Sequence, residues 1–314
     1  MKLFFATDLQ GSDICFRKLL NAGSFYGAET IIMGGDLTGK MVVPVVRQQG
    51  QSYLADFQGS KVSLETEGEM QRFNQKLRDM GYYPYLTDVE ELSALGKDRE
   101  RADSVFRQLM VERIRAWVEL ADTKLRGQRM KFFFILGNDD DYCIDEVLAT
   151  SQHMVNLDGN IANLDEGYEI LGVSGSNPTP WHTPREFAEH EIKFKICEVA
   201  ERVENMQQCV FNIHVPPFDS KIDEVAELDE DFRVVTEVGY ARKKPAGSKS
   251  VRWAIENYQP MLGLFGHIHE GRGYIKIGRT LCVNPGSNYT EGVLNGCLVT
   301  LAKGKVKDFQ LTIG

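Results

Sequence analysis

The sequence lacks several features that define other classes of protein. None of its apolar runs approaches the roughly 18 residues of a membrane-spanning helix. The apolar stretch within residues 1–8 is too short for a secretory signal, and no cleavage pattern follows it. The six cysteines are scattered without a Cys-x-x-Cys pair, so we expect buried free thiols rather than disulfides. These absences predict a cytoplasmic protein with no membrane partner.

Basic residues are also in short supply. The chain has 36 Lys and Arg against 45 Asp and Glu, a formal net charge of −9. A broad nucleic-acid-binding surface needs an excess of basic residues, so the balance argues against nucleic acid as a partner. The 314 residues, 42% of them hydrophobic, are typical of a globular protein with one large α/β domain or two ordinary ones.

Short apolar runs alternate with helical patterns along most of the chain, which predicts an α/β fold. A helix is expected over residues 13–22, and another is expected to begin at the capping box Thr183–Glu186, with Pro184 at its first position. From Tyr274 onward, short strands and glycine turns are typical of antiparallel hairpins. The other strands are expected at residues 2–6, 30–33, 131–136, 170–173, 209–213 and 261–265.

The region from residue 63 to residue 127 has a different pattern. Its apolar residues recur at helical spacing, which predicts a helical hairpin inserted into the α/β core at about 63–127. Gly81 is expected to follow the first helix, and Thr87 with Glu90 to form the capping box of the next. We expect this hairpin to pack on the body; a lid or an arm for oligomerisation is the alternative.

Histidine is scarce, with six in the chain, and two of them, His267 and His269, stand one residue apart directly after an apolar run. Polar residues also follow four other expected strands. Open α/β sheets bind ligands beyond the carboxyl ends of their strands, so these side chains are expected to share one rim. The residues at these strand ends are Asp8, Asp36, Asn138, His214, His267 and His269.

This mixture of carboxylate, amide and imidazole suits Mn, Fe or Zn. Such a set is too large for one catalytic zinc, but it suits two metals roughly 3.5–4 Å apart that share a carboxylate. A competing motif lies at Gly34–Lys40, which fits the G-x-x-x-x-G-K pattern of a phosphate-binding loop. That loop needs Ser or Thr next, and Met41 stands there instead, so we do not expect a P-loop.

At these residues the chain resembles the calcineurin-like metallophosphoesterase superfamily. The superfamily pattern runs D-x-H, G-D, G-N-H, a lone His and G-H-x-H. Asn284–Ser287 resembles the turn that closes many members, and two stretches, Gly175–Pro180 and His214–Pro217, resemble the prokaryotic branch of predicted phosphoesterases. In this sequence the pattern appears, in the same order, as Asp8-Leu9-Gln10, Gly35-Asp36, Gly137-Asn138-Asp139, His214 and Gly266-His267-Ile268-His269.

The resemblance implies a single domain over 1–314, folded as a four-layer α/β/β/α sandwich of two mixed sheets with the helical insertion. It also implies two divalent metal ions, with manganese favoured, and hydrolysis of a phosphate ester by a hydroxide that bridges them. One metal would be held by Asp8, Gln10, Asp36 and His269. The other would be held by Asp36, Asn138, His214 and His267.

Two positions depart from the superfamily pattern. Gln10 replaces a histidine, and its neutral amide either ligates weakly or hydrogen-bonds a metal-bound water. Asp139, the candidate catalytic residue, replaces a histidine that assists the phosphate. Its carboxylate repels a phosphate dianion unless protonated, which favours phosphodiesters over monoesters. Asp140 and Asp141 are expected to cap a helix that starts near Tyr142.

Other candidates are less tied to the pattern. Asn177 and His182 lie in a proline-rich loop and are expected to border the site as substrate-binding residues, with a plain surface turn as the alternative. The basic stretch 242–249 either binds an anionic substrate ahead of a helix or forms a solvated loop. The expected partner is a phosphorylated small molecule. The alternative function is a non-catalytic scaffold with a degraded metal site; a nuclease is disfavoured by the acidic charge.

Overall fold

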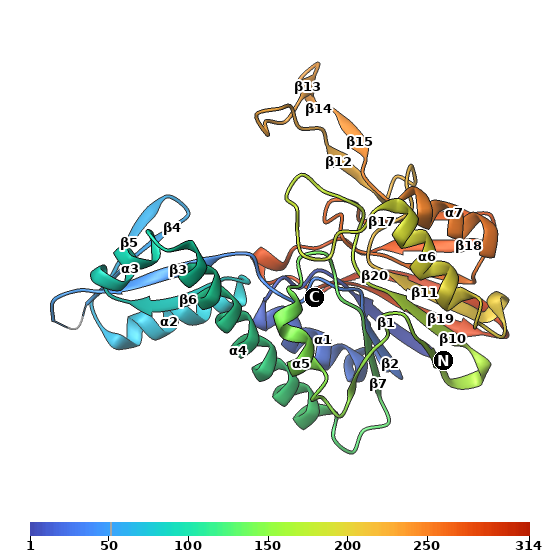
Figure 1. Cartoon of the computed structure of the whole chain (residues 1–314). Helices are drawn as coiled ribbons and strands as arrows, with labels where there is room; N and C mark the ends of the chain where they lie inside the picture. Colours follow the sequence, from blue (N-terminus) through green and yellow to red (C-terminus); the bar gives the residue numbers. More distant parts are fainter. Residues whose placement is uncertain (51) are drawn as a thin grey trace.

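The computed structural model describes residues 1–50 and 52–314, and within them the body of the chain forms two six-stranded mixed sheets (Figure 1). The first sheet has the order β20-β19-β1-β2-β7-β8. Its strands β1, β2, β7 and β8 are parallel, and β19 runs antiparallel to β1. The bounds are β1 Lys2–Ala6, β2 Thr30–Met33, β7 Lys131–Phe134, β8 Met154–Asn156, β19 Asn295–Ala302 and β20 Lys305–Ile313.

The second sheet has the order β17-β18-β16-β11-β10-β9. Its four central strands are parallel, and the two outer strands, β17 and β9, run antiparallel to their neighbours. The expected strands over 2–6, 30–33 and 209–213 are confirmed, and the ends of the others shift by one or two residues. The bounds are β9 Ile161–Asn163, β10 Glu169–Val173, β11 Cys209–Ile213, β16 Leu262–Leu264, β17 Gly273–Ile277 and β18 Thr280–Asn284.

One apolar cluster joins the two sheets, and helices cover their other faces. Leu3 and Phe5 of β1 lie in the shared cluster with Leu264 of β16, whereas Phe4 of β1 packs with the helices, as the alternation of a strand requires. Helices α1 (Asp13–Tyr26) and α4 (Arg99–Leu125) pack on the first sheet. Helices α6 (Glu189–Ala200) and α7 (Lys249–Tyr258) pack on the second. The fold is therefore mixed α/β.

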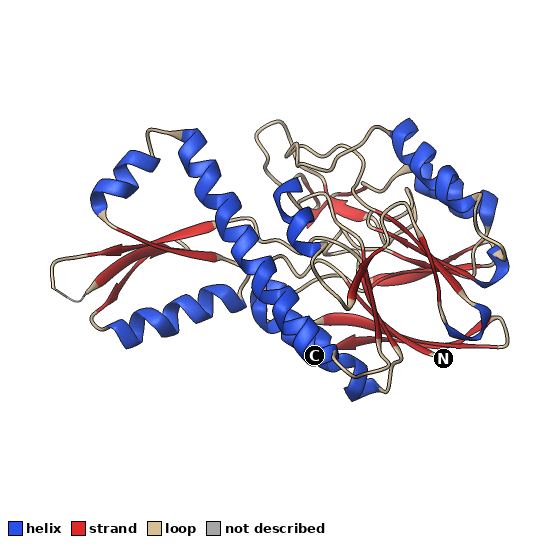
Figure 2. Cartoon of the chain, turned by 60° about the horizontal axis from the view of Figure 1, so that its bottom comes forward, coloured by secondary structure: helices blue, strands red, loops and turns tan. Residues whose placement is uncertain are grey.

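The expected helical hairpin over 63–127 is wrong. The insertion begins earlier and contains a four-stranded sheet in the order β5-β4-β3-β6, with its own apolar cluster (Figures 1 and 2). Pro44 within Val42–Arg47 and the three polar residues within Ser60–Leu64 obscure the strand signal. The bounds are β3 Val42–Arg47, β4 Tyr53–Phe57, β5 Ser60–Leu64, α2 Glu67–Asp79, β6 Tyr83–Thr87 and α3 Val89–Leu95.

Helix α4 ties this inserted unit to the body. Its C-terminal half packs into the cluster under the first sheet through Ile114 and Trp117, both buried. Trp117 stacks on Phe16 of α1 with ring centroids 4.2 Å apart, and its indole nitrogen donates to Asp13. The expected packing of this helix on the body is thus confirmed for its C-terminal half.

Two expected helix starts are wrong. Thr183 and Glu186 do pair, but α6 begins only at Glu189, because Arg185 donates its backbone N–H to the carbonyl of Asn138 and the chain makes a turn at residues 184–185. Helix α3 is capped by Asp88 rather than Thr87. None of the helices in the described part of the chain combines the length and apolar character needed to cross a membrane.

We predict that Ile114→Ala lowers the free energy of unfolding by about 2–5 kcal/mol, because it leaves a cavity in the cluster that α4 shares with the body. The neighbouring exposed Arg115→Ala serves as the matched control, with a change within about 0.5 kcal/mol. Urea unfolding of both variants measures this. Equal stabilities would contradict the packing of α4 as an integral part of the core.

Candidate metal centre

The predicted ligands gather at the carboxyl ends of central strands from both sheets. Asp8, Asp36 and Asn138 follow β1, β2 and β7, which are neighbours in the first sheet. His214 follows β11, and the histidine pair follows β16, its neighbour in the second sheet. Because the two sheets share one apolar cluster, their strand ends meet at one edge of the body.

Glycines at these strand ends allow the close approach. A Cβ on Gly137 would lie 1.9 Å from Oδ1 of Asp36, and a Cβ on Gly266 would lie 2.5 Å from Oδ2 of Asp8. Any side chain at these two positions would displace a candidate ligand. The site therefore requires glycine at both positions, Gly137 and Gly266.

Four of the candidate metal ligands have left-handed backbone conformations. Their φ angles are 54° at Asp8, 47° at Gln10, 53° at Asp36 and 67° at His267. Such values are uncommon outside glycine and persist only where surrounding contacts over-determine them. Here the backbone N–H of His267 donates to the carboxylate of Asp8, and the N–H of Gln10 donates to the carbonyl of Asp36. These hydrogen bonds between the turns stabilise the unusual backbone conformations at the site.

Asp8, Asp36 and His269 form a first ligand group. One ligand atom from each lies within 4.8 Å of the other two. Nε2 of His269 lies 3.4 Å from Oδ1 of Asp8. Two carboxylates and an imidazole so placed are a donor set that suits a divalent cation such as Mn, Fe or Zn.

The side-chain amide of Gln10 is a second, independent indication of a cation site. Its Nε2 donates to Oδ2 of Asp36 at 2.8 Å and to Oδ2 of Asp139 at 3.0 Å, which fixes the orientation of the amide. Its Oε1 is buried and has no hydrogen-bond partner among the described residues. A buried acceptor without a partner is costly, and a cation or a water at this position would satisfy it.

Asn138 and His214 form a second group with Asp36. Nε2 of His214 lies 3.2 Å from Oδ1 of Asn138 and 3.5 Å from Oδ2 of Asp36. Nδ1 of the same ring lies 2.7 Å from the carbonyl oxygen of Gly34 and donates to it, which leaves Nε2 free to ligate. The His267 ring lies edge-on to His214, with centroids 5.3 Å apart.

The electrostatics of these groups show an excess of negative charge. Burial and the neighbouring Asp139 raise the pKa of Asp36 to about 7. Burial opposes ionisation of His214, but the carboxylate of Asp36 raises its pKa to about 10. Burial and the charge of His214 lower the pKa of His267 to about 3. In the metal-free protein a proton on His214 therefore supplies positive charge where a cation is expected.

The three aspartates after Asn138 have separate roles. Burial opposes ionisation of Asp139, but Lys40 and Gln10 hold its pKa below the usual range, the opposite of what a proton donor needs. Asp140 caps no helix, contrary to expectation; it is buried and accepts the N–H groups of Leu37, Thr38 and Gly137. Asp141 does cap the short helix Tyr142–Ile144, as expected.

Among the described residues, no hydrogen bond or ion pair joins Asn177 or His182 to the proposed ligands. Nδ2 of Asn177 donates to the carbonyl of Ala246, and His182 is exposed. The loop reaches the site through a different residue: Oγ1 of Thr183 accepts a hydrogen bond from Nδ2 of Asn138 at 2.8 Å. Substrate binding by Asn177 and His182 stays a prediction.

Lys40 is a site residue that the sequence analysis did not identify. Its Nζ lies 2.6 Å from Oδ2 of Asp139. Burial opposes its charge, but the carboxylates of Asp36 and Asp139 raise its pKa above the usual value. The available signal was the G-x-x-x-x-G-K match, whose lysine does face an anionic centre although the motif is not a P-loop.

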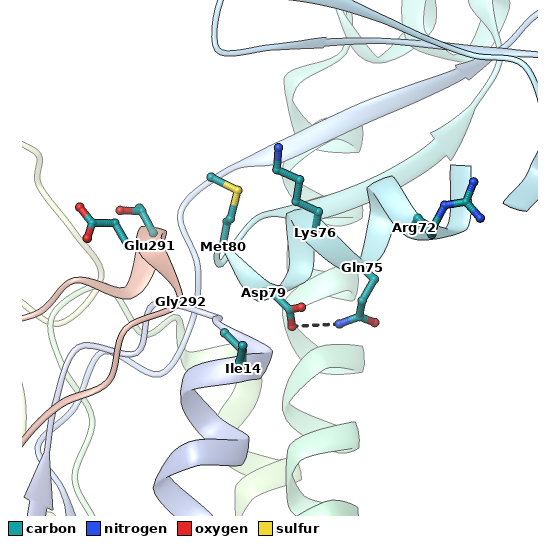
Figure 3. Close-up of a pocket in the computed structure, with 9 residues that line it drawn as sticks. Ile14, Arg72, Gln75, Lys76, Asp79, Met80, Glu291 and Gly292 are labelled. Atoms are coloured by element: carbon teal, nitrogen blue, oxygen red, sulfur yellow. Dashed lines mark hydrogen bonds between the residues drawn. The ribbon is translucent and has the colours of Figure 1, made fainter. Parts of the chain in front are cut away.

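A separate pocket of about 520 Å³ lies where α2 of the inserted unit meets the chain at residues 290–292 (Figure 3). Arg72, Lys76 and Asp79 of α2 line it from one side, and Ile14 and residues 290–292 from the other. None of its lining residues is a candidate metal ligand. The pocket therefore marks the junction between the inserted unit and the body, not the chemical centre.

No model of a known protein family matches this sequence. The uncharacterized protein MJ1162 of Methanocaldococcus jannaschii is 33% identical over 178 residues, which cover 56% of this chain and 70% of that protein. The chain therefore belongs to the same family as this archaeal protein.

Two solved structures share the fold over nearly the whole chain. One has a TM-score of 0.60 and 14% identity, and the match covers 99% of this chain and 98% of that one. The other, TT1561 of Thermus thermophilus, has a TM-score of 0.56 and 13% identity, with 100% and 97% covered. A solved archaeal phosphodiesterase is a more distant match, with a TM-score of 0.32 and 11% identity, too low to establish a shared fold.

We predict that Gly137→Ala abolishes stoichiometric manganese binding, because the added methyl group displaces the carboxylate of Asp36. Overpacking should also lower the free energy of unfolding by about 1–3 kcal/mol. Metal content after gel filtration and thermal unfolding measure both effects. Gly68→Ala, where the nearest heavy atom to the new Cβ lies 3.6 Å away, is the control and should bind as the unmodified protein does. Equal metal content in the two variants would contradict the assignment.

We also predict that manganese binding at pH 8 releases at least one proton per chain, because a ligating histidine must be neutral. His214, with its pKa raised to about 10, is protonated at that pH in the metal-free protein. The affinity should weaken as the pH falls. Calorimetric titrations in two buffers with different ionisation enthalpies measure the release, and a heat independent of the buffer would refute it.

Proposed function

We propose that this chain is a metal-dependent phosphoesterase with two divalent cations, built as a four-layer α/β/β/α sandwich. The shared cluster between the two sheets and the helices on their outer faces support the layer order. The observation that carries the function is the convergence of Asp, Asn and His side chains from both sheets on Asp36, beside the unpartnered Oε1 of Gln10.

The residues divide between two cation sites. Asp8, Gln10, Asp36 and His269 would hold the first. Asp36, Asn138, His214 and His267 would hold the second. Bound cations supply positive charge that activates water as a nucleophile and stabilises phosphoryl oxygens. We favour manganese because the ligands are oxygen and imidazole donors without thiolate.

The protein's own groups hold this arrangement rigid. Gly34 fixes the His214 ring through its carbonyl, and Thr7 and the N–H of His267 orient the carboxylate of Asp8. Asp36 is held by Nε2 of Gln10 and by the backbone N–H of Asp139. Ligands fixed in this way need little reorganisation when a cation or a phosphate ester binds.

A phosphorylated small molecule is the proposed substrate, with phosphodiesters first because Asp139 places a carboxylate beside the ligands. The net charge of −9 argues against nucleic acid. All six cysteines are free, which is compatible with a reducing compartment and with the proposed cytoplasmic location.

The test is hydrolysis of bis- and mono-p-nitrophenyl phosphate by manganese-loaded protein. We predict activity that chelation removes, with the diester cleaved faster. Asp36→Asn should lose more than the roughly 10- to 100-fold typical of outer-shell ligand changes, because both sites share this carboxylate. The exposed Asp231→Asn is the control and should retain full activity. A wild-type protein that takes up no metal and cleaves neither ester would support a non-catalytic scaffold instead.

A further inference from the structure

Lys40 lies at the edge of the candidate metal centre and is connected to its ligands through Asp139. Its Nζ and the Nε2 of Gln10 both contact Oδ2 of Asp139, at 2.6 and 3.0 Å. Oδ1 of Asp139 accepts from Nδ2 of Asn138 at 3.2 Å. The carboxylate of Asp139 thus links the lysine to two of the proposed ligands.

The backbone before Lys40 is fixed by contacts with the body and with the inserted unit. The N–H of Gly39 donates to the hydroxyl of Tyr83 at 3.0 Å. A Cβ on Gly39 would lie 2.0 Å from the carbonyl oxygen of Gly81 and 3.1 Å from that of Gln10. The backbone that carries Lys40 is therefore held in place, unlike the backbone of a mobile surface loop.

The ammonium of Lys40 retains donors for a ligand. It carries three N–H groups, and Asp139 is its one hydrogen-bonding or ion-pair partner in the described part of the chain. Its side chain is 47% exposed, whereas that of Asp139 is 11% exposed. The pair thus has a buried carboxylate end beside the ligands and an accessible cationic end.

We propose that Lys40 contacts the substrate and donates to a non-bridging phosphoryl oxygen. This inference rests on the phosphoesterase function proposed above. Asp139 is then a positioning residue that holds the ammonium in place. The lysine offsets part of the charge of Asp139 and supplies the cation that the superfamily pattern provides by histidine.

The experiment measures binding of inorganic phosphate to the manganese-loaded protein by calorimetry. Lys40→Met should weaken phosphate binding about 10- to 100-fold, the range for one lost hydrogen bond to a charged group, with unchanged manganese content. Lys40→Arg should keep most of the affinity because it retains the charge. The exposed Lys61→Met is the matched control and should bind phosphate as the wild type does.

The double variant Lys40→Met/Asp139→Asn separates substrate contact from simple charge balance. If Lys40 contacts the anion, the double variant stays weak. Phosphate affinity restored to the wild-type value would show that the lysine only neutralises Asp139, and would overturn the inference. Equal affinity in wild type and Lys40→Met, or no phosphate binding to the loaded wild type, would overturn it as well.

The two proposals fail in different ways. Hydrolysis assays on the same samples report on the phosphoesterase function. A loaded wild type that binds phosphate through Lys40 but cleaves no ester would refute the enzyme and leave the lysine's contact with the anion supported. If the wild type cleaves esters and the Lys40→Met variant has the same KM, only the proposed substrate contact of Lys40 is refuted.

Discussion

The close approach of the Asp36 carboxylate to the backbone of Gly137 is the constraint on which the site depends. The space between them admits no Cβ, so the turns after β2 and β7 pack directly on each other. From this position Oδ2 of Asp36 accepts a hydrogen bond from Nε2 of Gln10 and lies 3.5 Å from Nε2 of His214, which follows a strand of the other sheet. One carboxylate therefore belongs to both ligand groups. Its role depends on how the two sheets pack against each other.

The inserted unit supports this arrangement from outside. Arg113 of α4 is buried and donates to the carbonyls of Gly11 and Tyr82. It also lies 3.5 Å from Asp13. The turn that carries Gln10 is thereby held by a helix that belongs equally to the body and the insertion. Lys40 enters the site from the same junction, so the insertion contributes to the chemistry of the centre as well as to its rigidity.

Much of the core could be predicted from the sequence because buried parallel strands are short, apolar and followed directly by their functional residues. Asp8, Asp36 and His214 were recognisable in this way. The inserted sheet was not, because Pro44 interrupts the apolar run of β3 and β5 is short and mostly polar. Lys40 was missed for another reason: a lone lysine carries no periodicity, and its role depends on an ion pair with a residue 99 positions away in the chain.

The false helix start at Thr183 shows the same limit. The capping residues formed their local hydrogen bond, yet the backbone of Arg185 paired with Asn138 in a turn and did not enter a helix. A tertiary contact overrode a local preference, and that contact brings Thr183 to Asn138. Local signals therefore predicted the central strands of the two large sheets well, and the inserted sheet and the loops around the site poorly.

The most direct test of the account is an anomalous-diffraction map of crystals grown with manganese. The account predicts two peaks roughly 3.5–4 Å apart on either side of the Asp36 carboxylate. One peak should neighbour His269 and the other His214. A map with no peak at Asp36, or with manganese only at surface carboxylates, would contradict the central claim.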